Sequence, residues 1–328
     1  MRDWRNILLK FTEFGWNGFY FEIPEDLRFT REGGDAKTGY MRFSSDRLLL
    51  ELRWQSFKDK KPKKVKPIEE VADDLLKKIE KSVKRKIHVK RKSTTFINQH
   101  NSYFMSLKTN FDESIYLWCC EESGRIIICR FMLTSPDEDV RDTVERMVNS
   151  MKCHSEGSNV WSIMGFRFEA PNTFMLTDRK ITLGRAHILL SEQKLTPFTE
   201  SRREVLVEYF SMANVRFKDY KNPKRWFEKN YMKELKRRYR GIKFQESKPR
   251  RFRGHIAYLR RGVAVTGLTT RRSSLYTNLT WYCSNLNRIY TLTLSSHISR
   301  PVFLKRTLDE DAFENFVKEV TSSVRCHI

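Results

Sequence analysis

The chain has 328 residues, of which 39% are hydrophobic, 13% aromatic and 31% charged, which is enough apolar surface for about two folded domains. Lys and Arg outnumber Asp and Glu by 63 to 40, giving a net charge of +23. This composition excludes a disordered chain. The sequence contains no apolar run of about 18 residues and no signal-peptide stretch after Met1, so we expect a cytoplasmic protein without a transmembrane helix.

The charge is unevenly distributed along the chain. Residues after Gly157 include 33 basic and 15 acidic side chains, a net charge of +18, whereas the residues before it have a net charge of +5. This asymmetry predicts an anionic partner for the second half. The six cysteines form no CxxC pair and predict reduced, mostly buried thiols. Only four glutamines accompany the many charged residues, a composition typical of heat-adapted proteins.

The sequence repeats itself, with residues of about 16–154 matching residues 161–327 in unbroken order. The matching segments are Phe19–Pro24 with Phe166–Pro171, Leu50–Leu52 with Val207–Tyr209, His100 with His255, Trp118–Cys120 with Trp281–Cys283, Arg125 with Arg288, and Cys153-His154 with Cys326-His327. The alternative, two unrelated α/β domains, leaves this order to chance. The repeat therefore predicts two diverged copies, residues 1–157 and a strongly basic second copy, residues 158–328.

In the first copy, the expected elements are strands and two amphipathic helices. Residues 67–83 place apolar side chains on one face at helical spacing, with acidic residues early and basic residues late. The other expected elements, in chain order, are a strand at 19–23, a strand at 48–54, strands at 114–120 and 125–133 joined by a turn, and a closing helix that carries Val140, Val144, Met147 and Met151.

The sequence of the second copy predicts the same order of strands and helices. The expected elements are a strand at 205–211, a helix from Pro223 to about Tyr239 with a core face of Phe227, Tyr231, Leu235 and Tyr239, strands at 276–283 and 288–294, and a closing helix with Phe313, Val317, Val320 and Val324. Each copy thus follows the order β-β-β-α-β-β-β-β-α. We expect an α+β fold, in which two tandem copies of an antiparallel sheet packed with helices are related by a pseudo-twofold axis.

The element order resembles the Mog1/PsbP-like α/β/α sandwich. The motif that carries the resemblance is Phe21–Pro24 at the end of an early strand, repeated at Phe168–Pro171. Members of that fold are accessory proteins bound to a GTPase or a photosystem, so the resemblance implies an accessory role without catalysis. No functional residue of those families can be carried over to this sequence.

Basic residues concentrate around the first helix of each copy. Residues 58–92 contain 15 basic and 6 acidic side chains, and residues 216–261 contain 18 basic and 4 acidic ones. Clustered Lys and Arg neutralise phosphates and release counterions, which predicts a nucleic-acid-binding surface. The candidate contacts are Lys229, Lys233, Lys236, Arg237, Arg240, Lys248, Arg250, Arg251 and Arg253, with Lys60, Lys61, Lys63 and Lys64 in the first copy. The alternative is a solvated, highly charged helix face.

Common catalytic motifs are absent from the sequence. It contains no Gly-rich phosphate loop, no HExxH and no GxSxG, and Gly33-Gly34 predicts only a turn. His100 and His255 are the best catalytic candidates, although a histidine in a turn before a strand is more often a structural hydrogen-bonding group. An enzyme would also need a pocket that gathers His, Glu and Tyr side chains from one copy. Glu51 and Glu208 lie inside apolar strands, where we expect them to face outward or to pair with a basic residue.

Two Cys-His pairs, Cys153-His154 and Cys326-His327, together with Cys120 and Cys283, could supply metal ligands. Adjacent side chains at a helix end are expected to point in different directions, so we predict buried cysteines that act as small hydrophobic residues, with no metal and no cofactor.

The sequence therefore predicts a non-enzymatic, basic binding protein that associates with nucleic acid, RNA or ribonucleoprotein rather than a specific DNA site. The alternative is a protein-interaction module with a protein partner and no nucleic acid. Neither hypothesis involves a membrane.

Overall fold

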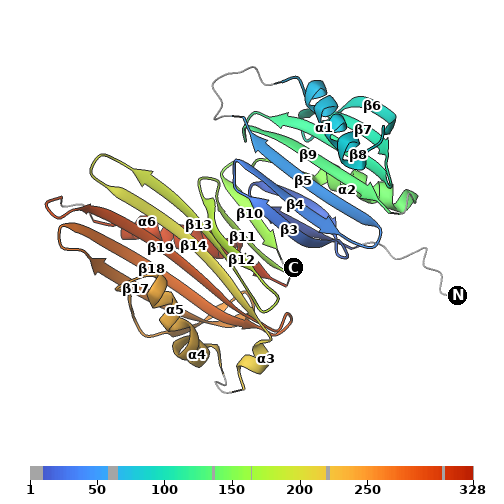
Figure 1. Cartoon of the computed structure of the whole chain (residues 1–328). Helices are drawn as coiled ribbons and strands as arrows, with labels where there is room; N and C mark the ends of the chain where they lie inside the picture. Colours follow the sequence, from blue (N-terminus) through green and yellow to red (C-terminus); the bar gives the residue numbers. More distant parts are fainter. Residues whose placement is uncertain are drawn as a thin grey trace. The chain divides into compact units, whose positions relative to one another are not determined.

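The computed structural model divides the chain into two compact units, Met1–Asn159 (unit 1) and Val160–Ile328 (unit 2), shown in Figure 1. The structure describes residues 10–57, 66–134, 137–163, 165–218, 222–304 and 307–327. Each unit contains one large antiparallel sheet.

Unit 1 is organised around a seven-stranded sheet. In spatial order its strands are β3 (Arg28–Gly34), β4 (Thr38–Ser44), β5 (Leu48–Ser56), β9 (Arg125–Leu133), β8 (Asp112–Cys120), β7 (His100–Lys108) and β6 (His88–Ile97). The other elements are the hairpin β1 (Phe11–Trp16) and β2 (Phe19–Pro24) and the helices α1 (Ile68–Val83) and α2 (Glu138–Ser150).

The two faces of this sheet are covered differently. Helix α1 buries Ala72 and Ile79 against β7 and β8, where Leu107 and Leu117 are fully buried. On the opposite face, the β1–β2 hairpin packs aromatic side chains on the sheet: the rings of Phe14 in β1 and Phe43 in β4 meet edge to face, with centroids 4.8 Å apart. Helix α2 lies against β2. The sheet is therefore the middle layer of unit 1.

Unit 2 has an eight-stranded sheet. Its strands are, in spatial order, β12 (Met175–Ile181), β13 (Arg185–Leu195), β14 (Glu200–Ser211), β19 (Arg288–Pro301), β18 (Thr270–Cys283), β17 (His255–Thr266) and β15 (Lys243–Phe244), and β16 (Lys248–Phe252) also pairs with β17. Three further strands, β10 (Ser158–Ile163), β11 (Phe166–Pro171) and β20 (Arg325–Cys326), are hydrogen-bonded side by side. The helices are α3 (Ala213–Arg216), α4 (Pro223–Trp226), a π-helical turn (Phe227–Tyr231), α5 (Met232–Arg238) and α6 (Glu310–Ser323).

The strand order of the two large sheets is equivalent. The path β3-β4-β5-β9-β8-β7 in unit 1 corresponds to β12-β13-β14-β19-β18-β17 in unit 2. Strand length distinguishes them: β5, β8 and β9 have nine residues each, whereas β14, β18 and β19 have 12, 14 and 14. The sheet of unit 2 therefore carries strand extensions that unit 1 lacks.

The predicted α+β class, with two helix-packed sheets, is wrong, because the chain is mostly β, with 54% of its residues in strands and 21% in helices. Five strands, not three, precede the first helix of each unit. Two causes explain the error. Strand β3 has no fully buried residue and so lacks apolar alternation. Strands β18 and β19 extend beyond their predicted bounds, and these extensions bury polar residues such as Ser274 and Ser295, where the pattern search relied on apolar ones.

The predicted core face of the first helix in unit 2 is confirmed. Phe227, Tyr231, Leu235 and Tyr239 are all at most 7% exposed, although a π-helical turn interrupts the helix between Phe227 and Tyr231. Trp226 is also buried, so it belongs to the core rather than to an exposed stacking surface. None of the helices in the described part of the chain is long and apolar enough to cross a membrane.

Candidate metal centres

Four side chains of unit 1 converge where the sheet meets the end of α2. His100 is the first residue of β7 and Cys120 is the last residue of β8, and these strand ends are adjacent because the two strands are antiparallel. Cys153 and His154 follow α2, just after a β-bridge joins Lys152 to β2. The four potential ligand atoms lie within 4.8 Å of one another.

Unit 2 repeats this arrangement with the equivalent residues. His255 is the first residue of β17, Cys283 is the last residue of β18, and Cys326 lies in the short strand β20 with His327 directly after it. Their ligand atoms also lie within 4.8 Å of one another. Each unit thus has a Cys₂His₂ cluster, called here the unit 1 cluster and the unit 2 cluster.

The distances within the clusters suit a tetrahedral metal ion. In the unit 1 cluster, Cys120 Sγ is 3.3 Å from His154 Nδ1, and Cys153 Sγ is 3.3 Å from His100 Nε2. In the unit 2 cluster, the corresponding sulfur–nitrogen distances are 3.4 and 3.2 Å. A tetrahedral zinc ion, with Zn–S bonds of about 2.3 Å and Zn–N bonds of about 2.0 Å, separates neighbouring S and N ligands by about 3.6 Å. Small outward shifts would therefore admit the ion.

Neighbouring Cys and His side chains were expected to point apart, and this expectation is wrong. Both pairs lie beyond the end of a helix, where the backbone is no longer helical: Met151, the residue that ends α2, has φ −74° and ψ 120°. In this conformation Cys153 Sγ and His154 Nδ1 are 3.7 Å apart. His327 reaches its cluster with a left-handed backbone, φ +62°.

Hydrogen bonds favour a thiolate in the unit 1 cluster. The pKa of Cys120 is lowered to about 5, first by its hydrogen bond with Cys153 and also by the backbone N–H of Ser123, which donates to Cys120 Sγ at 3.3 Å. The indole N–H of Trp118 donates to Cys153 Sγ at 3.4 Å. Thiolate is the form of cysteine that binds metals, so this polar environment is suited to a cation.

The cysteine after the last helix has a raised pKa in both clusters. The hydrogen bond with Cys120 and burial raise the pKa of Cys153, and burial raises the pKa of the Cys326 thiol in the unit 2 cluster to about 11. Burial and the neighbouring His327 both lower the pKa of His255, which favours the neutral imidazole that a metal requires. His327 itself is exposed, whereas His154 of the unit 1 cluster is partly buried. The unit 2 cluster is therefore the more accessible of the two.

The donor set of each cluster selects the metal and its role. Two thiolates and two imidazoles in a tetrahedral arrangement are typical of zinc. Four protein ligands also fill a tetrahedral shell, which leaves no position for a substrate or a reactive water. The geometry thus favours a structural ion over a catalytic one.

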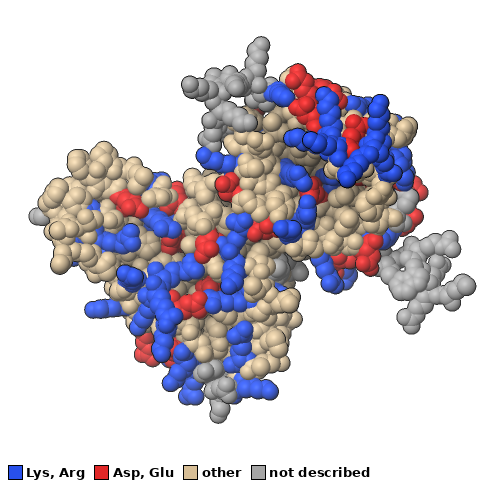
Figure 2. Space-filling view, in the orientation of Figure 1, with Lys and Arg blue, Asp and Glu red and all other residues tan. Residues whose placement is uncertain are grey.

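The predicted nucleic-acid-binding residues of unit 2 lie on α4–α5 and on the segment around β16, and all nine are exposed. These residues are Lys229, Lys233, Lys236, Arg237, Arg240, Lys248, Arg250, Arg251 and Arg253. Within the described ranges, none of them forms an ion pair with a carboxylate, and Figure 2 shows basic side chains gathered over the α5 region with few acidic ones between them. The candidates of unit 1, Lys60, Lys61, Lys63 and Lys64, lie outside the described residues.

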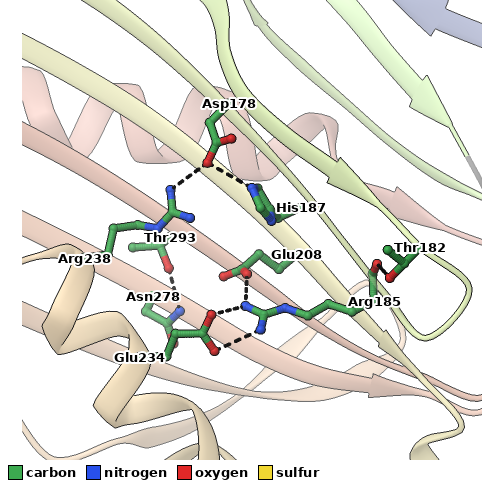
Figure 3. Close-up of polar contacts among 9 residues, drawn as sticks. All are labelled: Asp178, Thr182, Arg185, His187, Glu208, Glu234, Arg238, Asn278 and Thr293. Atoms are coloured by element: carbon green, nitrogen blue, oxygen red, sulfur yellow. Dashed lines mark hydrogen bonds and ion pairs between the residues drawn. The ribbon is translucent and has the colours of Figure 1, made fainter. Parts of the chain in front are cut away.

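Ion pairs hold α5 against the sheet of unit 2 (Figure 3). Arg185 of β13 bridges Glu208 of β14, at 2.7 Å, and Glu234 of α5, at 2.5 Å. Asp178 of β12 forms an ion pair with Arg238 of α5, at 3.6 Å, and contacts His187 at 3.0 Å. The prediction that Glu51 and Glu208 pair with basic residues is confirmed, since Glu51 contacts both Arg42 and Arg53.

A pocket with the composition required for the enzyme hypothesis lies beside these ion pairs, but its residues were not predicted. It is lined by His297, Glu204 and Tyr239 of unit 2, rather than by His100 or His255. This pocket could not be predicted from the sequence, because Glu204 and His297 are 93 positions apart and neither lies in a motif. The two predicted histidines belong to the metal clusters instead.

No protein-family model matches the chain, and no curated protein is significantly similar to it. Among solved structures, the chain is similar to PsbP (CyanoP) from Synechocystis sp. PCC 6803, with 13% identity and a TM-score of 0.36 over 47% of this chain and 98% of that one. It is also similar to the immunity protein TplEi of the T6SS from Pseudomonas aeruginosa, in its apo form, with 11% identity and a TM-score of 0.31 over 97% of both chains.

A PsbP structure is thus among the similar ones, at a TM-score of 0.36. Identities and TM-scores this low do not establish a shared function.

Proposed function

We propose that this protein binds two zinc ions, one in the Cys₂His₂ cluster of each unit, and that the ions stabilise its fold. The observation that carries the proposal is the repetition: the same four residue types, from equivalent strand ends and chain ends, converge in both units with their ligand atoms within 4.8 Å. The two copies have net charges of +5 and +18, a difference of 13, yet both contain these four residue types at equivalent positions.

The position of each cluster suggests what the ion contributes. In unit 1, the ion would tie the segment after α2 to β7 and β8 through Cys153 and His154. In unit 2, it would tie β20 and the residue after it to β17 and β18. Metal binding to a site absent from the unfolded chain adds directly to folding stability. Each ion would thus stabilise its unit by holding the segment after the last helix against the sheet.

The test is the zinc content of the purified protein, measured by inductively coupled plasma mass spectrometry. The wild type is expected to hold two zinc ions per chain, Cys153→Ser one, Cys326→Ser one, and the double variant none. Cys119→Ser is the matched control, because Cys119 lies next to Cys120 but belongs to neither cluster.

Retention of two ions by Cys119→Ser, with the stepwise loss in the cluster variants, would support the proposal. A wild-type protein that takes up no zinc from a zinc-supplemented medium, or a double variant that still holds two ions, would contradict it.

A second candidate function, binding of nucleic acid, is supported by the exposed basic residues of α5 and β16 that have no carboxylate partner among the described residues. The assay is an electrophoretic shift with RNA and with single- and double-stranded DNA at two salt concentrations. We expect binding that weakens with salt and is lost when Arg237, Arg250 and Arg251 are replaced by Glu. Absence of binding at low salt would remove this candidate and leave the predicted protein-interaction module as the alternative.

A further inference from the structure

The strand extensions of unit 2 carry a polar surface that has no counterpart in unit 1. Because Cys120 matches Cys283 and Arg125 matches Arg288, the start of β8 corresponds to Leu275 and the end of β9 corresponds to Ser296. The residues of β18 before Leu275 and of β19 after Ser296 are therefore additional. Figure 1 shows these long strands continuing beyond α5.

Two of the additional residues, His297 and Ser274, lie in a row with Arg202 across adjacent strands. Arg202 of β14 is opposite His297 of β19, and His297 is opposite Ser274 of β18. Two residues further along, Ser299 is opposite Arg272. Since side chains alternate along a strand, these residues share one face of the sheet. The extensions thus place two arginines, a histidine and hydroxyl groups on a single face.

Two adjoining cavities, of about 210 and 330 Å³, lie over this face. Both are lined by Arg238, Tyr239, Arg272 and His297, so the end of α5 forms one wall and the strand extensions form the floor. Cavities of this size accommodate a small ligand.

The charge of the cavity walls is positive. The larger cavity is also lined by Arg237 and Arg240, and the smaller one by Arg202, Glu200 and Glu204. Five arginines therefore face two carboxylates. Arg202 is paired with Glu204 at 2.7 Å, whereas no described carboxylate lies within 4 Å of Arg237, Arg240 or Arg272. Positive charge is therefore in excess in the cavity walls, which favours an anionic ligand.

Arg238 and His297, which line both cavities, are held in place by neighbouring residues. Asp178 contacts Arg238 at 3.6 Å (Figure 3), which fixes the end of α5 over the sheet. His297 Nδ1 is 2.8 Å from Ser274 Oγ, and its Nε2 is 2.9 Å from Ser295 Oγ. Ordered donors lose little entropy when they bind a ligand, so a preformed arrangement favours binding.

We infer that these cavities bind a small phosphate-bearing anion through Arg272, Arg240 and Arg237. A guanidinium group donates two parallel hydrogen bonds to a phosphate, and several arginines around one cavity can bind its oxygens from different sides. This site lies in unit 2 only and is independent of the zinc proposal. It places a specific small-molecule site within the basic region that the sequence assigned to nucleic acid.

The experiment is isothermal titration calorimetry of the full-length protein at low salt, with inorganic pyrophosphate and adenosine monophosphate as probes. We expect saturable binding of one molecule per chain, and the tighter probe shows whether a free phosphate or a nucleotide is preferred. Arg272→Gln should weaken binding by 10-fold or more. Arg240→Gln provides a second variant and should weaken binding in the same direction.

Arg250→Gln is the matched control, because it removes the same charge from an exposed arginine of β16 that does not line either cavity. It should change affinity by less than 2-fold. Failure of both probes to bind, or equal weakening by Arg250→Gln and Arg272→Gln, would overturn the inference, since the second result would assign binding to overall charge.

Discussion

Glu51 and Glu208 occupy equivalent positions in the two units, yet only the replacement of Glu51 by Gln should clearly lower the free energy of unfolding. Glu51 contacts two arginines, Arg42 and Arg53, which lower the pKa of its carboxyl although burial opposes them as the largest single influence. Glu208 is 2% exposed and has only Arg185 as a direct partner, so burial raises its pKa. The charged form is therefore favoured by folding at Glu51 and disfavoured at Glu208.

The size of the change in the free energy of unfolding follows from the solvent exposure of the arginines that pair with Glu51. Arg42 and Arg53 are 46% and 55% exposed, so solvent screens each ion pair toward the range of surface pairs, about 0.2–1 kcal/mol. With the loss of charge-assisted hydrogen bonds included, Glu51→Gln should lower the free energy of unfolding by about 1–2 kcal/mol at pH 7. Glu208→Gln should leave it within about 0.5 kcal/mol of the wild type or raise it.

The assay is urea unfolding at several pH values, followed by circular dichroism, with the zinc content held constant. Because the pKa of Glu51 is lowered in the folded state, its stabilisation is complete above the unfolded-state pKa of about 4.3 and is lost as the pH falls through the folded-state pKa. The difference between Glu51→Gln and the wild type should therefore be largest at pH 7 and shrink below about pH 4. A difference that does not change with pH, or a larger loss in Glu208→Gln than in Glu51→Gln, would refute the reasoning.

Three further outcomes follow from the packing and the clusters. Trp118→Phe removes the indole hydrogen bond to Cys153 and should weaken zinc binding in unit 1 by roughly 10- to 100-fold in a chelator competition, while a variant with unchanged affinity would show that the hydrogen bond does not matter. Ile79→Ala leaves a cavity in the core under α1 and should lower the free energy of unfolding in urea by about 2–4 kcal/mol. Lys78→Ala on the same helix should lower it by less than about 0.5 kcal/mol. Equal losses would contradict the assigned buried face of the helix. Removal of zinc by a chelator should lower the midpoint temperature of unfolding measured by calorimetry, and re-addition of zinc should restore it. An unchanged midpoint would contradict the claim that the zinc ions stabilise the fold.

The sequence predicted the repeated positions and the buried helix faces better than the extent of the strands. Phe227, Tyr231 and Leu235 recur at helical spacing and are buried, because an apolar stripe alone determines which face packs. The extensions of β18 and β19 escaped prediction because their buried positions are polar. Ser274 and Ser295, at most 3% exposed, contact the two ring nitrogens of His297 at 2.8 and 2.9 Å, an arrangement that becomes visible only when the two strands are adjacent.

The sequence contains the repeated Cys and His residues of both metal clusters, but the expected directions of neighbouring side chains argued against a shared metal ion. Each copy keeps one His at a strand start, one Cys at a strand end and one Cys-His pair after the last helix. The objection assumed a helical backbone at the Cys-His pair, whereas the last helix of each unit ends before it. The cavity over β14, β18 and β19 had no such signal, since its residues come from separate strands and only the sheet register brings them together.

The most direct measurement is the zinc K-edge X-ray absorption spectrum of the purified protein. Two Cys₂His₂ clusters predict an average first shell of two sulfur atoms at about 2.3 Å and two nitrogen atoms at about 2.0 Å per zinc ion. Cys153→Ser should reduce the zinc content by half and leave this average shell unchanged, because the unit 2 cluster has the same donors. A shell made mainly of oxygen, or one without sulfur, would contradict the proposal that these clusters bind zinc.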